Sequence, residues 1–95
     1  MIQITRHDGR ISIYGHAGFA PHGQDIVCAG VSTLAQTLIA SIENLTYDKI
    51  EYEATPGMVD IKHGNLSEKS KTLIDSFFVG CELIAATYPN HVRVE

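Results

Sequence analysis

The sequence has few cysteines and few basic residues, and each shortage excludes a class of protein. Its two cysteines, Cys28 and Cys81, are too few for a disulfide framework, so we expect a reducing compartment and a cytoplasmic protein. Cys81 falls on the apolar stripe of a predicted helix and is expected to pack in the core. Seven lysines and arginines against eleven acidic residues give a formal net charge of −4, which argues against direct nucleic-acid binding.

Long apolar runs, linkers and repeats are also missing. No uninterrupted apolar run approaches the roughly 20 residues that a membrane span needs, so we expect no membrane association. The first six residues alternate between apolar and polar types and are too polar for a signal peptide. Without a linker or a low-complexity tract, residues 1–95 are expected to form a single domain.

Four segments of the chain alternate between apolar and polar residues, which is the pattern of half-buried strands. The first two cover about 1–6 and 10–15, and the Asp8-Gly9 pair between them is a strong hairpin signal. The other two lie within 50–54 and 59–63, around a second turn that contains proline and glycine. The sequence therefore predicts two β-hairpins.

Two further segments carry apolar residues at spacings of three and four, which predicts amphipathic helices. The first covers about 25–45, with Asp25 either as its N-cap or in its first turn. The second begins near Asn65 and is stopped by Pro89. A short strand is expected at 92–94. The predicted fold is α+β, a single two-layer domain with the order ββαββαβ, in which two main helices pack on a mixed sheet.

A cysteine at the start of the first helix and a histidine at the end of the second strand are the candidates for catalysis. If Asp25 caps the helix, Cys28 lies in its first turn, where unpaired amides and the helix dipole favour a thiolate and can stabilise an oxyanion. His16 opens the loop 16–24 that leads to this helix, so its imidazole is expected to approach the thiol. The alternatives are a small buried core cysteine and a histidine that only bonds to the loop.

Two neighbouring polar residues are candidates for supporting roles. Asp25 is expected either to orient His16 as a third member of the site or to serve only as the helix cap. Ser32 lies one helical turn after Cys28 and can bond to the thiolate or orient the imidazole. Its alternative is a hydrogen bond back to the carbonyl of Cys28, which is common for serine inside helices.

A zinc site is a competing hypothesis, because His16, His22 and Cys28 recur at intervals of six. Structural zinc sites normally use four ligands in more closely spaced pairs. The fourth ligand would have to come from His63, His91 or an acidic residue. We therefore favour a protein without a metal and expect His22 to be an exposed loop residue.

The residues around the two catalytic candidates resemble the ribosomal-processing cysteine protease family, Prp. The resemblance rests on Gly15-His16-Ala17-Gly18, on Gly23-Gln24-Asp25-Ile26-Val27-Cys28-Ala29 and on Val31-Ser32. The length of the chain and the order of its elements are similar to the family as well. Gly30 is a departure, because alanine is more usual there in the family.

This resemblance implies an activity and assigns the site. It places the catalytic histidine and cysteine at His16 and Cys28 and brings Asp25 and Ser32 into the motif. It also implies a mobile loop between the two catalytic residues. Gly18 and Gly23 supply the backbone freedom that this motion requires. Family members form homodimers and remove a short N-terminal extension from a large-subunit ribosomal protein, without a cofactor.

The sequence therefore predicts a cysteine endopeptidase with a Cys-His dyad. The alternative is a non-catalytic ribosome-associated module that holds a peptide in the same groove. The presence of both His16 and Cys28 favours the enzyme.

Overall fold

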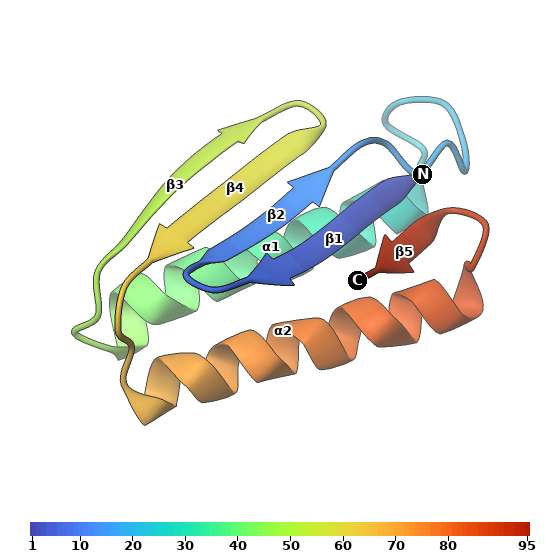
Figure 1. Ribbon diagram of the computed structural model, residues 1–95. Coiled ribbons are helices and arrows are strands. Elements are labelled where there is room, and N and C mark those ends of the chain that lie inside the picture. The colour runs from blue at the N-terminus through green and yellow to red at the C-terminus, as the bar shows by residue number, and fades with distance from the viewer.

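The five strands form one mixed sheet, and both helices pack against the same face of it (Figure 1). The computed structural model describes residues 1–95. In chain order the elements are β1 (Ile2–His7), β2 (Arg10–Tyr14), α1 (Ile26–Leu45), β3 (Ile50–Thr55), β4 (Met58–His63), α2 (Glu68–Thr87) and β5 (Val92–Val94). The order across the sheet is β3-β4-β2-β1-β5; β1 and β5 are parallel and all other neighbours are antiparallel. The predicted α+β fold and element order are confirmed.

The core lies between the sheet and the two helices. Alternation places every second residue of the central strands inward, and the register pairs Ile4 with Ile13 and Ile11 with Ile61. Burying each such side chain contributes roughly 1.5–3 kcal/mol. The helices complete the core with Val27, Val31, Ala35, Leu38, Ile39 and Ile42 from α1 and with Ile74, Phe77, Phe78 and Cys81 from α2.

Helix α1 is apolar on average, although polar residues interrupt its apolar runs. Its 20 residues have a mean hydropathy of 1.5 in the most apolar window, so the helix is long and apolar enough to cross a membrane by length and composition. A core helix passes the same test, and one side of α1 packs on the sheet. The opposite side carries exposed polar residues such as Ser32, Gln36 and Glu43.

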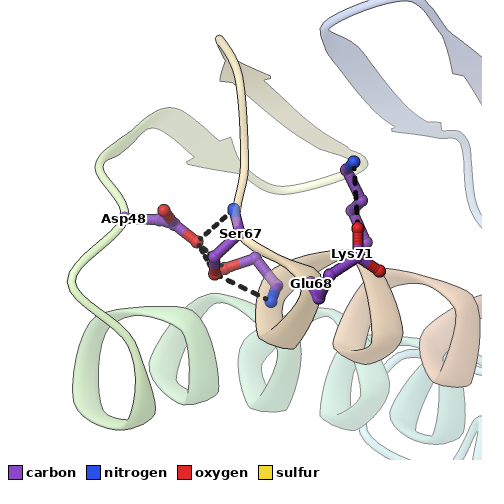
Figure 2. A network of polar contacts seen from close by, with 5 residues as sticks. Asp48, Ser67, Glu68 and Lys71 are labelled. Carbon is purple, nitrogen blue, oxygen red and sulfur yellow. Dashed lines mark hydrogen bonds and ion pairs between the residues drawn. The ribbon is translucent and has the colours of Figure 1, made fainter.

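The second helix begins later than predicted. Its N-cap is Ser67, whose hydroxyl accepts a hydrogen bond from the Ser70 amide, so the expected cap at Asn65 is wrong. Ser67 is fixed by Asp48 in the α1–β3 loop, which accepts bonds from the Ser67 hydroxyl at 2.5 Å and amide at 3.1 Å (Figure 2). The Ser67 hydroxyl and the buried Ser70 hydroxyl hold the pKa of Asp48 below its usual value, against desolvation. This long-range contact decides where α2 starts.

Two glycines at the contact between the helices provide a matched stability test. A Cβ on Gly30 would lie 3.3 Å from the terminal carbon of Ile84, whereas one on Gly80 would lie 3.0 Å from both methyl carbons of Leu34. Alanine favours the helix over glycine by about 1 kcal/mol. We expect Gly30→Ala to raise the melting temperature by up to about 4–8 °C, since Ile84 can shift slightly. Gly80→Ala should gain less or lose stability, and equal gains in thermal unfolding would contradict this explanation.

Candidate active site

Cys28 lies in the first turn of α1, and Asp25 is the N-cap, which is one of the two positions expected for it. One carboxylate oxygen, Oδ1 of Asp25, accepts hydrogen bonds from the amides of Val27 at 3.0 Å and Cys28 at 2.9 Å. The thiol of Cys28 is only partly buried and is not in a disulfide. The cap therefore presents a free thiol at the N-terminus of the helix.

The second oxygen of the same carboxylate ties the preceding loop to the helix. Oδ2 of Asp25 accepts from the amide of Phe19 at 3.0 Å and from that of Ala20 at 3.4 Å. The Cys28 amide is the main reason why the pKa of Asp25 lies below its usual value, with Phe19 and Ala20 assisting and desolvation opposing. The structure contains no hydrogen bond between Asp25 and the His16 ring, so capping is the role that it shows.

Asp25→Asn separates the two functions of this carboxylate. Asparagine is as good an N-cap as aspartate, but its amide nitrogen cannot accept from Phe19 and Ala20. We expect a modest loss of melting temperature at neutral pH and a larger proportional loss of turnover, because the loop is released.

The pH dependence of stability provides a second test of Asp25. Its pKa in the folded protein is lower than the ordinary value of 3.8, so the ionised carboxylate stabilises the fold above pH 3.8. This stabilisation is lost as the pH falls through the folded-state pKa. Below about pH 4, the melting temperature of the wild type should therefore fall more steeply than that of Asp25→Asn. Parallel curves of melting temperature against pH for the two proteins would contradict the assignment.

His16 follows β2, and its ring lies against the β3–β4 turn. A Cβ on Gly57 would come within 2.7 Å of Nε2 of His16. The turn is held there because the Gly15 amide donates to the Gly57 carbonyl at 2.8 Å. No hydrogen bond joins the His16 ring to the sulfur, but the next amide, that of Ala17, donates to Sγ of Cys28 at 3.2 Å. Catalytic hydrogen bonds often tighten only when the substrate is bound.

Gly57→Ala tests whether the turn positions the imidazole. At a φ of +78° an alanine is strained, and its methyl group would also displace the His16 ring. Gly9→Ala in the β1–β2 turn is the comparison, because φ there is +72°, the added carbon would lie 2.9 Å from the His63 carbonyl oxygen, and Gly9 does not line the cavity. We expect similar losses in melting temperature but a roughly 100-fold fall in kcat/KM for Gly57→Ala alone. Equal activities of the two variants would show that the turn does not hold His16.

His16 and Cys28 line the same cavity of about 650 Å³. Its walls are the loop between β2 and α1, with Gly18 and Gly23, the first turns of α1 and the β3–β4 turn. Ser32 lies on the α1 wall and makes no hydrogen bond to either catalytic candidate. The cavity thus places a thiol, an imidazole and a free hydroxyl around one space.

The zinc hypothesis finds no support in the arrangement of the side chains. No group of three or more histidine, cysteine, aspartate or glutamate residues is placed to hold a metal ion. His22 is exposed at the loop, as predicted. The other thiol, Cys81, is fully buried, and burial raises its pKa to about 12. Its predicted place in the core is confirmed.

The amides at the start of α1 are less available than the sequence suggests. Those of Val27 and Cys28 already donate to the Asp25 side chain, and that of Ala29 donates to the Asp25 carbonyl at 3.0 Å. The donor that faces the sulfur is instead the Ala17 amide, on the loop. Sequence reasoning missed this amide, although Ala17 stands directly beside His16.

The comparisons with known proteins identify the family of this chain. A family model described as cysteine protease Prp matches residues 1–93. The chain belongs to the Prp family. It is therefore a cysteine protease, and the predicted family is confirmed.

Curated members of the Prp family match along almost their whole length. The chain is 34% identical to the ribosomal processing cysteine protease Prp of Bacillus subtilis, with 99% of this chain and 96% of that protein covered. It is 30% identical to the protein of the same name from Mycoplasma genitalium, with 99% of this chain and 94% of that protein covered. The match therefore extends over the whole domain.

Solved structures share the fold. The Prp protease of S. aureus, in complex with a covalently linked product peptide, gives a TM-score of 0.90 at 23% identity over 99% of this chain and 95% of that one. The protein SMU.848 of Streptococcus mutans gives a TM-score of 0.85 at 29% identity, with 100% and 92% covered. The two-layer arrangement is thus that of the Prp structures.

Proposed function

We propose that this chain is an endopeptidase that removes a short N-terminal extension from a large-subunit ribosomal protein, with Cys28 as nucleophile and His16 as general base. The observation that carries the proposal is the shared cavity, which holds a helix-start thiol and the imidazole of the neighbouring loop. The names of the relatives, which are ribosomal processing cysteine proteases, support the substrate class. A substrate peptide and a covalently linked product peptide in the S. aureus structures support a peptide ligand.

The proposed reaction begins with transfer of the Cys28 proton to the imidazole of His16. The sulfur lone pair forms a bond to the scissile carbonyl carbon, and the carbonyl π electrons move to the oxygen. Collapse of this intermediate re-forms the C=O bond and breaks the C–N bond, and the leaving amine takes the proton from His16. Water then attacks the thioester carbon and gives a proton to His16. Collapse of this second intermediate breaks the C–S bond, the peptide leaves as its carboxylic acid, and the sulfur takes the proton back from His16.

The other residues around the cavity are assigned supporting roles in this proposal. The Ser32 hydroxyl has no intramolecular partner at the site and is free to bond to the substrate backbone. The tip of the loop, residues 21–23, is exposed and opens to admit the peptide, with Gly18 and Gly23 as the points of freedom. Asp25 holds the base of the loop through Phe19 and Ala20 during this motion.

We further propose that the enzyme works in the cytoplasm as a homodimer. Its two cysteines are both free, which suits a reducing compartment, and its proposed substrate is a ribosomal protein. The homodimer follows from the resemblance to the family. Sedimentation of the purified protein at several concentrations tests it, and a mass of one chain throughout would reject the dimer.

The test of the proposed function is incubation with the N-terminally extended ribosomal protein, followed by measurement of intact masses. We expect two products from the wild type and none with Cys28→Ala. The rival is a ribosome-associated module that binds the peptide without cutting it. Binding of the extension by the wild type with no change of mass after long incubation would favour that rival and reject the enzyme's proposed substrate.

A further inference from the structure

Ala17 connects the catalytic sulfur to a histidine of the α2–β5 turn. The residue is 3% exposed, and its amide donates to Sγ of Cys28 at 3.2 Å. Its carbonyl oxygen contacts Nδ1 of His91 at 2.9 Å. A carbonyl oxygen can only accept, so Nδ1 of His91 carries the hydrogen in this contact. One side chain, 74 positions further along the sequence, therefore fixes the residue whose amide faces the thiol.

His91 stands on a rigid support. Its amide donates to the Tyr88 carbonyl at 2.9 Å, and its carbonyl accepts from the Ile2 amide at 2.9 Å, which joins it to α2 and β1. The ring of Phe19, from the loop, meets the ring of His91 edge-on with centroids 5.4 Å apart and that of Tyr88 at 5.3 Å. The loop segment 17–19 is thus held from the α2–β5 turn by one hydrogen bond and two aromatic contacts.

The Ala17 amide is well placed to act on the reacting atoms. A carbonyl carbon bonded to Sγ brings its oxygen near a donor that already lies 3.2 Å from the sulfur, and an oxyanion donor must lie within hydrogen-bond distance of that oxygen. The neighbouring helix amides of Val27 and Cys28 are already occupied by Asp25. The loop amide is therefore the donor at this sulfur that carries no other bond within the protein.

We propose that His91 is a positioning residue of the active site, which orients the Ala17 amide toward the thiolate and toward the oxyanion of the tetrahedral intermediate. This inference rests on the proposed roles of Cys28 and His16. His91 touches neither the substrate nor the sulfur; it acts through the Ala17 carbonyl. Loss of its hydrogen bond lets the 17–19 segment move, and small displacements of catalytic donors have large effects on rate.

Two substitutions separate the hydrogen bond from the ring packing. His91→Asn keeps an N–H donor close to the position of Nδ1, and His91→Phe keeps the aromatic edge beside Phe19 without any donor. His63→Phe is the matched control, because Nδ1 of His63 also contacts a backbone carbonyl, that of Gly64 at 2.9 Å, and His63 is not part of the cavity wall. His91→Ala is the second donor-free variant if His91→Phe does not fold.

The measurements are kcat and KM on an N-terminally extended peptide and the rate at which iodoacetamide labels Cys28. We expect His91→Phe to lower kcat by about tenfold with little change in KM and to slow the labelling severalfold. His91→Asn should retain most of both rates, and His63→Phe should match the wild type. A kcat for His91→Phe equal to that of the wild type, or equal losses in the Asn and Phe variants, would overturn the proposal.

The labelling rate keeps this inference separate from the proposed function, since it needs no substrate. If the wild type fails to cleave the peptide, the proposed function fails, whatever the His91 variants do. If the wild type cleaves and the donor-free variants cleave and label equally fast, only the role of His91 fails.

Discussion

Replacing Cys28 with alanine or serine is expected to abolish peptide cleavage and leave the protein folded. The thiol is partly exposed at the start of α1 and contributes little to the core, so its removal costs little stability. The nucleophile forms the covalent intermediate, and its loss should reduce kcat by about 10⁴-fold or more. Hydrolysis of an extended peptide, followed by chromatography, measures this effect.

Cys81→Ala is the matched control for that experiment. Cys81 is fully buried in the core and does not line the cavity, so we expect full activity and a loss of about 1 kcal/mol in the free energy of unfolding. The reverse pattern, with a folded but inactive Cys81→Ala and an active Cys28→Ala, would show that the wrong thiol had been assigned.

His16→Ala has the second largest expected effect. Without the imidazole, the thiol has no base to take its proton and the leaving amine has no acid, so kcat should fall by roughly 10²–10⁴-fold. KM should change less, because the ring is assigned to proton transfer and not to binding. Steady-state kinetics on the same peptide measure both values.

His63→Ala provides the comparison for His16. This histidine ends β4, on the hairpin that also carries Gly57, but it lies at the end of β4 away from that turn and does not line the cavity. We expect wild-type kinetics from it. A His16→Ala variant with the same kcat as His63→Ala would remove the general base from the mechanism.

The local patterns of the sequence were sufficient to predict most of the fold. Successive side chains of a strand point to opposite faces of the sheet. The alternation of apolar and polar residues therefore predicted the inward-facing positions Ile2, Ile4, Ile11 and Ile13, which are buried. The cap at Asp25 could also be predicted, since it depends on amides only two and three residues away. Such features are determined by neighbours in the sequence.

Features that depend on distant residues were missed. The start of α2 at Ser67 depends on Asp48, which lies 19 positions earlier, and no local pattern distinguishes Ser67 from Asn65 as the cap. The hairpin that contains Gly57 was predicted, but not its contact with the His16 ring, because that contact follows from the pairing of β2 with β4. For the same reason, sequence reasoning considered His91 only as a fourth ligand in the zinc hypothesis.

The mean hydropathy of α1 could not be judged from the lengths of its uninterrupted apolar runs. Its small and branched residues raise the mean to 1.5, although polar residues interrupt every run. The structure explains both observations, because six apolar residues of α1 are buried in the core, whereas polar residues such as Gln36 and Glu43 are exposed, as are Ile26 and Leu45 at the two ends. Periodicity was the more informative signal.

The claim that Cys28 and His16 act as one catalytic unit is tested most directly by the rate of alkylation at each cysteine. Iodoacetamide at neutral pH, with labelled peptides resolved by mass, reports Cys28 and Cys81 separately in the wild type and in His16→Ala. We expect Cys28 of the wild type to react much faster than a free cysteine, Cys81 to react slowly, and His16→Ala to slow the labelling of Cys28. Labelling of Cys28 at the same rate in His16→Ala and in the wild type would mean that the imidazole does not activate the thiol, and the dyad would be rejected.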